Sequence, residues 1–147
     1  MSRGLINRSL PSFGSGLSSL QSEAAIAQLN YVLVVEDEYF IAADVKLVLN
    51  LAGCSEVDMV ADEQAALSLL ARRRPDGAVL DLNLSGKISF QLADLLTEMQ
   101  IPFVFMTGHE GSVIPRRFEG IVRCQKPIGP AYAAVALLRT ARRSAGI

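Results

Sequence analysis

Five short runs of mostly apolar residues recur along the chain, and segments with the apolar spacing of a helix follow four of them. A continuous apolar run of this length is typical of a strand that is buried on both faces. Such strands, joined by helical crossovers, indicate a parallel sheet with right-handed connections and helices on both faces. The predicted strands are residues 31–35, 56–61, 78–82, 103–106 and 121–124, and the predicted helices are residues 38–52, 62–70, 89–99 and 129–143.

This order of elements predicts an α/β fold: a doubly wound, five-stranded parallel sheet of the flavodoxin-like kind, with strand order 2-1-3-4-5. Between the fourth and fifth strands, residues 108–120 contain three glycines and a proline, which are poor helix formers. We therefore expect a reduced or irregular fourth helix. The domain covers residues 31–145, and residues 1–30 form an N-terminal arm in which a short helix over 16–28 would pack on this domain or on a partner.

Charge and residue content exclude several classes of function. The 14 basic and 15 acidic residues give a net charge of -1, which argues against a nucleic-acid partner. No apolar run approaches the roughly 18 residues that a membrane span needs. The two cysteines, Cys54 and Cys124, are read as buried free thiols, and the single histidine, His109, excludes a zinc site built on several histidines. We expect a cytoplasmic protein that binds neither nucleic acid nor membrane.

Polar side chains stand where the predicted strands end, the edge at which sheets of this kind bind ligands. Glu36 and Asp37 follow the first strand, Asp81 lies in the third, Thr107 ends the fourth, and Lys126 follows the fifth. Carboxylates about 4 Å apart repel by about 4 kcal/mol per pair at an effective dielectric near 20, so one of them takes up a proton or a cation lies among them. Oxygen ligands without histidine or cysteine favour Mg²⁺.

A lysine and a hydroxyl beside such a metal site suit phosphoryl chemistry. The Lys126 ammonium and the Thr107 hydroxyl can bind phosphoryl oxygens while an oxygen of Asp81 attacks the phosphorus in line. The sequence contains neither GxxxxGK[ST] nor GxGxxG, the loops that cradle nucleotide phosphates. We therefore expect a phosphoryl donor other than a bound nucleotide.

Four motifs lie in order along the chain: Val34-Val35-Glu36-Asp37-Glu38, Val79-Leu80-Asp81-Leu82-Asn83-Leu84, Met106-Thr107-Gly108 and Gln125-Lys126-Pro127-Ile128. Over about residues 31–145, they resemble the receiver domain of bacterial two-component response regulators. The resemblance implies that Asp81 accepts a phosphoryl group from a phosphohistidine of a sensor histidine kinase or a histidine phosphotransfer protein. It also implies a Mg²⁺ ion held by Glu36, Asp37, Asp81 and the backbone carbonyl of Asn83, with Thr107 and Lys126 on the phosphoryl oxygens.

The resemblance further implies a signalling switch in the bacterial cytoplasm rather than an enzyme, reset by slow hydrolysis of its own acyl phosphate. Because the sequence ends soon after Lys126, we expect a stand-alone receiver that signals by contact with an unknown downstream protein. Two alternatives stay open. One is a phosphorylation-independent binding module with a receiver's shape. The other, with less support, is a haloacid-dehalogenase-like phosphatase, a family that places a second acid where Asn83 stands.

Two features depart from the usual receiver pattern: the residue three positions before the lysine and the short stretch of residues 108–120. Receivers carry a tyrosine or phenylalanine three residues before the lysine, where this chain has Arg123. That residue is either a substitute for the aromatic switch or a surface charge. The sequence around Phe105-Met106-Thr107-Gly108 resembles the atypical FATGUY single-domain receivers, with Met106 in place of alanine. His109 is either an exposed loop residue or a group that tunes the access of water to the acyl phosphate.

Overall fold

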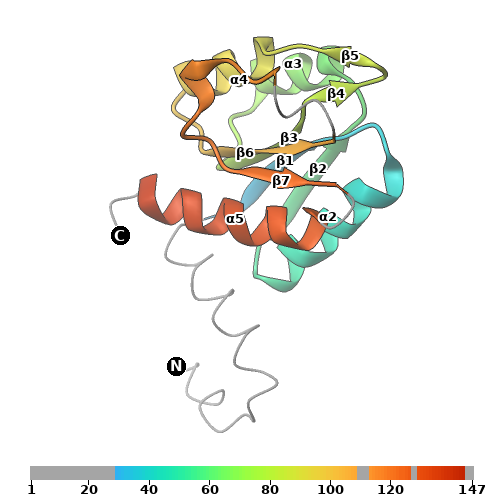
Figure 1. The fold of residues 1–147 in the computed structure, drawn as a ribbon. Coiled ribbons are helices and arrows are strands. Elements are labelled where there is room, and N and C mark those ends of the chain that lie inside the picture. Colours follow the sequence, from blue (N-terminus) through green and yellow to red (C-terminus); the bar gives the residue numbers. More distant parts are fainter. Residues whose placement is uncertain (1–28, 109–112, 127–128, 145–147) are drawn as a thin grey trace, which may run out of the picture.

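The computed structural model describes residues 29–108, 113–126 and 129–144 (Figure 1). The expected helix over 16–28 and nearly all of the N-terminal arm lie outside the described residues. His109 lies outside them as well. The described residues contain the whole of the predicted sheet and the helices that cover it.

A five-stranded parallel sheet forms the centre of the domain, in the order β2-β1-β3-β6-β7 (Figure 1). Taken in chain order, its five strands have the predicted order 2-1-3-4-5, and each neighbouring pair is parallel. The strands are β1 (Tyr31–Val35), β2 (Glu56–Val60), β3 (Gly77–Asp81), β6 (Phe103–Thr107) and β7 (Arg123–Gln125). The flavodoxin-like fold predicted from the sequence is confirmed.

Helices cover both faces of this sheet. Figure 1 shows α2 (Tyr39–Leu51) and α5 (Gly129–Ser144) on one face, with α3 (Glu63–Arg72) and α4 (Gln91–Glu98) on the other. Alternate residues of each strand point to opposite faces, so every central strand contributes to two apolar clusters. In β1, for example, Val34 belongs to the cluster under α2 and α5, whereas Leu33 belongs to the other. This two-sided burial explains why the central strands read as unbroken apolar runs.

The connection from β6 to β7 is short. Its described residues, 108 and 113–122, hold a 3₁₀ helix at Arg116–Phe118 and no α-helix, in agreement with the expected reduction of the fourth helix. Phe118 anchors this connection: its buried ring stacks on Phe90 and meets Phe105 edge to face, with centroid distances of 5.7 Å in both pairs. The connection is therefore held to the α4 side of the sheet by aromatic packing.

A small hairpin follows β3 and was not predicted. Its strands are β4 (Asn83–Leu84) and β5 (Lys87–Ile88), paired antiparallel. The two residues between them, Ser85 and Gly86, have φ angles of 55° and 78°. Positive φ at both central residues is the signature of a type I′ turn, whose twist matches that of the flanking strands.

Two elements begin two residues later in the structure than the sequence predicts. The last strand begins at Arg123 rather than at residue 121, although the Val122 carbonyl still accepts a hydrogen bond of 2.9 Å from the Phe105 N–H. Helix α4 begins at Gln91 rather than at Ser89, because the Ser89 hydroxyl donates to Glu63 at 2.7 Å and accepts from the Gln91 N–H at 3.3 Å. Among the helices that the structure describes, none combines the length and apolar content needed to cross a membrane.

Candidate functional site

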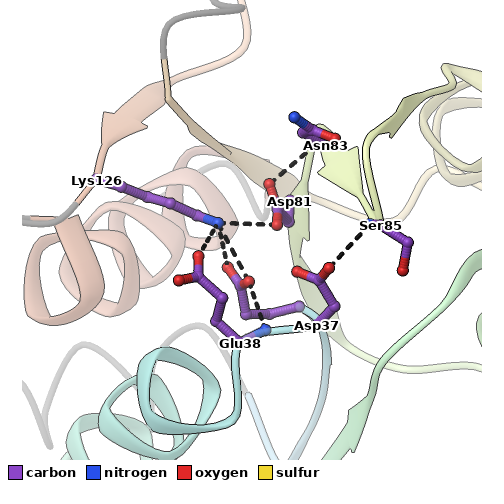
Figure 2. Close-up of polar contacts among 7 residues, drawn as sticks. Asp37, Glu38, Asp81, Asn83, Ser85 and Lys126 are labelled. Carbon is purple, nitrogen blue, oxygen red and sulfur yellow. Dashed lines mark hydrogen bonds and ion pairs between the residues drawn. The ribbon is translucent and has the colours of Figure 1, made fainter.

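Acidic side chains and one lysine meet at the carboxyl edge of the sheet (Figure 2). Glu36 directly follows β1, Asp81 is the last residue of β3, and Lys126 directly follows β7. Parallel pairing places Val35 of β1 beside Leu80 of β3, so the residues after them leave the sheet at the same edge. Residues separated by up to 90 positions in the sequence therefore meet in one charged cluster of Glu36, Asp37, Glu38, Asp81 and Lys126, which is called the pocket below.

The Lys126 ammonium is the centre of this pocket. Its Nζ lies 2.9 Å from Asp81 Oδ2, 2.9 Å from Glu38 Oε1 and 3.1 Å from Glu36 Oε1 (Figure 2). Its backbone N–H donates a 2.8 Å hydrogen bond to the carbonyl of Thr107, at the end of the neighbouring strand β6. Burial alone would lower the pKa of Lys126, but hydrogen bonds to Asp81 and Glu38 outweigh it and raise that pKa. The lysine is therefore a fixed cation among three acids.

Asp81 is buried, with only 2% of its surface exposed. Burial raises the pKa of the Asp81 carboxyl, while the hydrogen bonds from Lys126 and from the Asn83 N–H oppose that rise. The Asn83 N–H donates to Asp81 Oδ1 at 3.0 Å, and the lysine donates to Oδ2 at 2.9 Å. The two oxygens are thus held by different donors, which fixes the plane of the carboxylate.

Glu36 is equally buried, at 3% exposure, and its two oxygens differ. Oε2 accepts hydrogen bonds from the Glu38 N–H at 2.9 Å and from Lys126 at 3.2 Å. Oε1 lies near the ammonium but accepts no hydrogen bond from the described residues. Burial, helped by the charge of Asp81 and opposed by the hydrogen bond from the Glu38 N–H, raises the pKa of Glu36 to about 8.

Asp37 completes the acidic edge from an exposed position. Its Oδ2 accepts a 2.8 Å hydrogen bond from the Ser85 N–H, in the turn between β4 and β5 (Figure 2). Carboxylate oxygens of Glu36, Asp37 and Glu38 all lie within 4.8 Å of one another. An all-oxygen donor set with a buried, unsatisfied Glu36 oxygen fits a hard divalent cation such as Mg²⁺.

The other residues singled out in the sequence lie as follows. Thr107 is buried at the end of β6 and meets Lys126 through the backbone, and Asn83 begins β4 beside Asp81. Arg123 is exposed at the start of β7, in register with Phe105. His109 lies outside the described residues. The roles predicted for these residues stay predictions.

Two contacts of the site were missed in the sequence: the ion pair of Glu38 with Lys126 and the hydrogen bond of Ser85 to Asp37. The acidic run Glu36-Asp37-Glu38 was the available signal for the first contact. Its third member was assigned only to the following helix. The second contact is made by a backbone N–H, so the identity of residue 85 carries no signal for it.

A cavity of about 390 Å³ opens beside Asp81. Its walls come from the N-terminus of α3, the β4–β5 hairpin and the start of α4. Glu63, Ser85 and Lys87 are among the polar residues that line it, and Leu84 and Leu92 are among the apolar ones. This cavity therefore reaches the carboxyl end of β3, although the Asp81 side chain itself is buried.

Comparisons with known proteins agree with this geometry. The family model of the response regulator receiver domain matches residues 32–119. The solution structure of SdrG from Sphingomonas melonis Fr1 is 36% identical, with a TM-score of 0.64, over 75% of this chain and 97% of that chain. The BeF₃-activated conformation of SdrG from Pseudomonas melonis Fr1 is also 36% identical, with a TM-score of 0.62 and the same coverage.

A more distant match is NtrX from Brucella abortus, 26% identical with a TM-score of 0.66, over 78% of this chain and 27% of that longer chain. No curated protein sequence matches this chain. The family match spans more than half of the chain and includes both the β1 acids and Asp81. The chain belongs to the receiver domain family of two-component response regulators.

Proposed function

We propose that this receiver domain is a phosphoacceptor switch in which Asp81 takes a phosphoryl group from a phosphohistidine. The observation that carries the proposal is the 2.9 Å contact between Lys126 Nζ and Asp81 Oδ2 at the buried carboxyl end of β3. A buried carboxylate held by a fixed ammonium, beside an accessible cavity, has the surroundings that an attacking oxygen needs. The donor would be a sensor histidine kinase or a histidine phosphotransfer protein.

The transfer exchanges one bond to phosphorus for another. An Asp81 oxygen forms a bond to the phosphorus as the P–N bond to the donor histidine breaks, and the imidazole nitrogen keeps the electron pair and takes up a proton. Lys126 would then bind an oxygen of the transferred group, with the Thr107 hydroxyl on a second oxygen. Water later cleaves the acyl phosphate, which releases inorganic phosphate and restores the Asp81 carboxylate. Slow reversal of this kind suits a switch rather than a turnover enzyme.

Glu36, Asp37, Asp81 and the backbone carbonyl of Asn83 would hold a Mg²⁺ ion. Receiver domains generally bind Mg²⁺ at an acidic pocket, and the buried Glu36 oxygen without a hydrogen bond supports this use of the pocket here. The bound ion supplies positive charge to the phosphoryl oxygens. The acids of this chain orient the site, and Lys126 keeps the pocket from accumulating three unbalanced negative charges.

The relative SdrG supports activation by a phosphoryl group, since a BeF₃-activated conformation of that protein is known. A beryllium fluoride bound to an aspartate has the charge and shape of an acyl phosphate. We extend this chemistry to Asp81 because it ends β3, in register with β6 and beside the lysine. A bacterial cytoplasmic location and signalling through a downstream protein contact stay predictions.

Mass spectrometry after treatment with a small phosphodonor tests the proposal. Wild-type protein with acetyl phosphate and Mg²⁺ should gain one phosphoryl group, which is lost at alkaline pH as an acyl phosphate is. Asp81→Ala should gain none, and chelation of Mg²⁺ should abolish the gain in wild type. Asp44→Asn, which removes an exposed acid from α2, is the matched control and should be phosphorylated normally.

Three results would contradict the proposal, and two of them would favour an alternative. Labelling that survives Asp81→Ala would place the acceptor elsewhere. Wild-type protein that never gains a phosphoryl group would instead support a phosphorylation-independent binding module. Multiple turnover of a small phosphomonoester, dependent on Asp81, would favour a haloacid-dehalogenase-like phosphatase.

A further inference from the structure

Glu38 stands at a helix start but does not act as a helix cap. It is the N-cap residue of α2, and its side chain accepts no hydrogen bond from the first turn of that helix. Side chains at this position commonly accept one from the second or third N–H of the helix. The Glu38 carboxylate instead lies 2.9 Å from Lys126 Nζ, across the pocket from a residue 88 positions away (Figure 2). Its direction is therefore set by the lysine.

The Lys126 ammonium has no donor to spare in this arrangement. An ammonium carries three N–H donors, and Asp81, Glu36 and Glu38 each lie within 3.2 Å of its nitrogen. A phosphoryl oxygen on Asp81 also needs this ammonium, so it must replace one of the existing contacts. Any group that holds the lysine in the resting protein therefore competes with the phosphoryl group.

Among the three acids, Glu38 is the one that can release the lysine at low cost. The side chains of Glu36 and Asp81 are fully buried, whereas 60% of the Glu38 side chain is exposed. A buried carboxylate that loses its partner keeps a large desolvation penalty. An exposed carboxylate that loses its partner is solvated by water, and its ion pair contributes little free energy. Exchange at Glu38 is thus the cheapest route to a free ammonium donor.

We propose that Glu38 is a positioning residue that holds Lys126 in the resting state and gives up this contact when a phosphoryl group arrives on Asp81. The inference rests on the proposed function and deepens it. Glu38 acts through the lysine and does not touch the phosphoryl group. By competing for the ammonium, it lowers the affinity of the site for a phosphoryl group and favours the resting form.

Binding of beryllium fluoride at saturating Mg²⁺ tests this role. Glu38→Gln should bind it about fivefold more tightly than wild type, the effect expected from removing one partly exposed ion pair. Glu38→Asp keeps the charge but is shorter by one carbon–carbon bond, about 1.5 Å. The shorter side chain cannot reach the Lys126 ammonium, so this variant should also bind beryllium fluoride more tightly than wild type. Asp44→Asn, an exposed acid on the same helix, is the matched control and should equal wild type.

A second readout reports the contact itself in the resting protein. Nitrogen-15 NMR of the lysine side chains should show faster exchange of the Lys126 ammonium protons with water in both Glu38 variants. Because Glu38 makes no cap hydrogen bond and its ion pair is partly exposed, both variants should fold, with a thermal midpoint close to that of wild type. A titration with Mg²⁺ alone, run on each variant, separates effects on the metal from effects on the lysine.

Several outcomes would overturn the inference without touching the proposed function. Affinity for beryllium fluoride unchanged in Glu38→Gln would show that Glu38 does not compete. Tighter binding in Glu38→Gln, with wild-type binding in Glu38→Asp, would show that only the charge matters. Ammonium exchange that is unchanged in both Glu38 variants would show that Glu38 does not hold Lys126 in the resting protein. Failure of wild-type protein to bind beryllium fluoride at all would instead contradict the proposed function.

Discussion

The Ser85 N–H donates a 2.8 Å hydrogen bond to Asp37 Oδ2, which ties the turn of the β4–β5 hairpin to the acidic edge of the pocket. The two residues are 48 positions apart: Asp37 follows β1, and Ser85 lies between β4 and β5. One oxygen of Asp37 is therefore occupied before any cation binds. A cation that binds Asp37 should therefore alter its hydrogen bond with the hairpin backbone. This contact yields a first prediction.

Binding of Mg²⁺ should shift the backbone amide resonance of Ser85. The metal withdraws electron density from the Asp37 carboxylate, which weakens the hydrogen bond that this carboxylate accepts. A nitrogen-15 correlation spectrum, recorded during a Mg²⁺ titration and reversed with a chelator, checks this expectation. In Asp37→Asn the affinity for Mg²⁺ should fall at least about tenfold, with the Ser85 shift moving to correspondingly higher concentration. A Ser85 amide that stays still while Mg²⁺ binds would contradict the coupling.

Gly86→Ala should destabilise the fold by about 1 kcal/mol, because the φ of 78° at this position costs an L residue roughly that amount. A Cβ there would meet nothing within 4 Å, so the loss reports backbone strain alone. Gly120→Ala is the matched control. It too has nothing within 4 Å of its Cβ, but it has no such positive φ, and its stability should change little. Urea unfolding of both variants gives the comparison, and equal losses would refute the strain argument.

The stability of the metal-free protein should fall as the pH rises from about 4.5 to about 8. The pKa of Glu36 is raised by burial from 4.5 to about 8, so between these values the folded state binds more protons than the unfolded state. The stabilisation is complete below the unfolded pKa and is lost as the pH rises through the folded pKa. Urea unfolding in the presence of a chelator, at pH 5 and at pH 8.5, measures the difference.

Glu36→Gln should reduce this dependence, because the amide does not titrate and only the contribution of Asp81, whose pKa burial also raises, is left. The control variant Asp44→Asn, which removes an exposed acid from α2, should have the same pH dependence of stability as wild type. Saturating Mg²⁺ should stabilise wild-type protein more at pH 8.5 than at pH 5, since the cation competes with the proton for Glu36. A slope in Glu36→Gln equal to that of wild type would assign the proton to another group.

Phe118→Ala should destabilise the protein by about 3 to 5 kcal/mol, as truncation of a buried aromatic residue does. Its ring contacts Phe90 and Phe105 and is the anchor of the β6–β7 connection. Arg117→Ala, at the neighbouring position, removes an exposed ion pair to Asp94 and should cost no more than about 1 kcal/mol. Chemical unfolding at neutral pH ranks the two, and a larger loss for Arg117→Ala would contradict the packing argument.

The sequence predicted the position of the pocket because it depends on where parallel strands end. Glu36, Asp81 and Lys126 each lie at or directly after a strand end, so the strand order alone brings them together. The order of strands and helices does not predict the direction in which an individual side chain points. Glu38 was assigned to the helix start, and its ion pair depends on the position of Lys126, which the Thr107 carbonyl fixes.

The shift of the last strand has a similar cause. Ile121 and Val122 are apolar because they pack against the two core clusters, and this gave them the appearance of strand residues. Ladder pairing begins only at Arg123, opposite Phe105, because β7 is a short edge strand. Composition near the edge of a sheet therefore reports burial more faithfully than it reports hydrogen bonding. The β4–β5 hairpin escaped prediction because four residues give too short a pattern to detect.

Lys126 is fastened twice, through its backbone to the Thr107 carbonyl and through its ammonium to the acids of the pocket. The backbone hydrogen bond joins the residue after β7 to the end of β6, and the ammonium joins the same residue to the acids at the ends of β1 and β3. A movement of the carboxylates is therefore transmitted to the ends of β6 and β7 together. A change in the occupancy of the pocket is thus transmitted through main-chain atoms, whichever side chains a partner contacts.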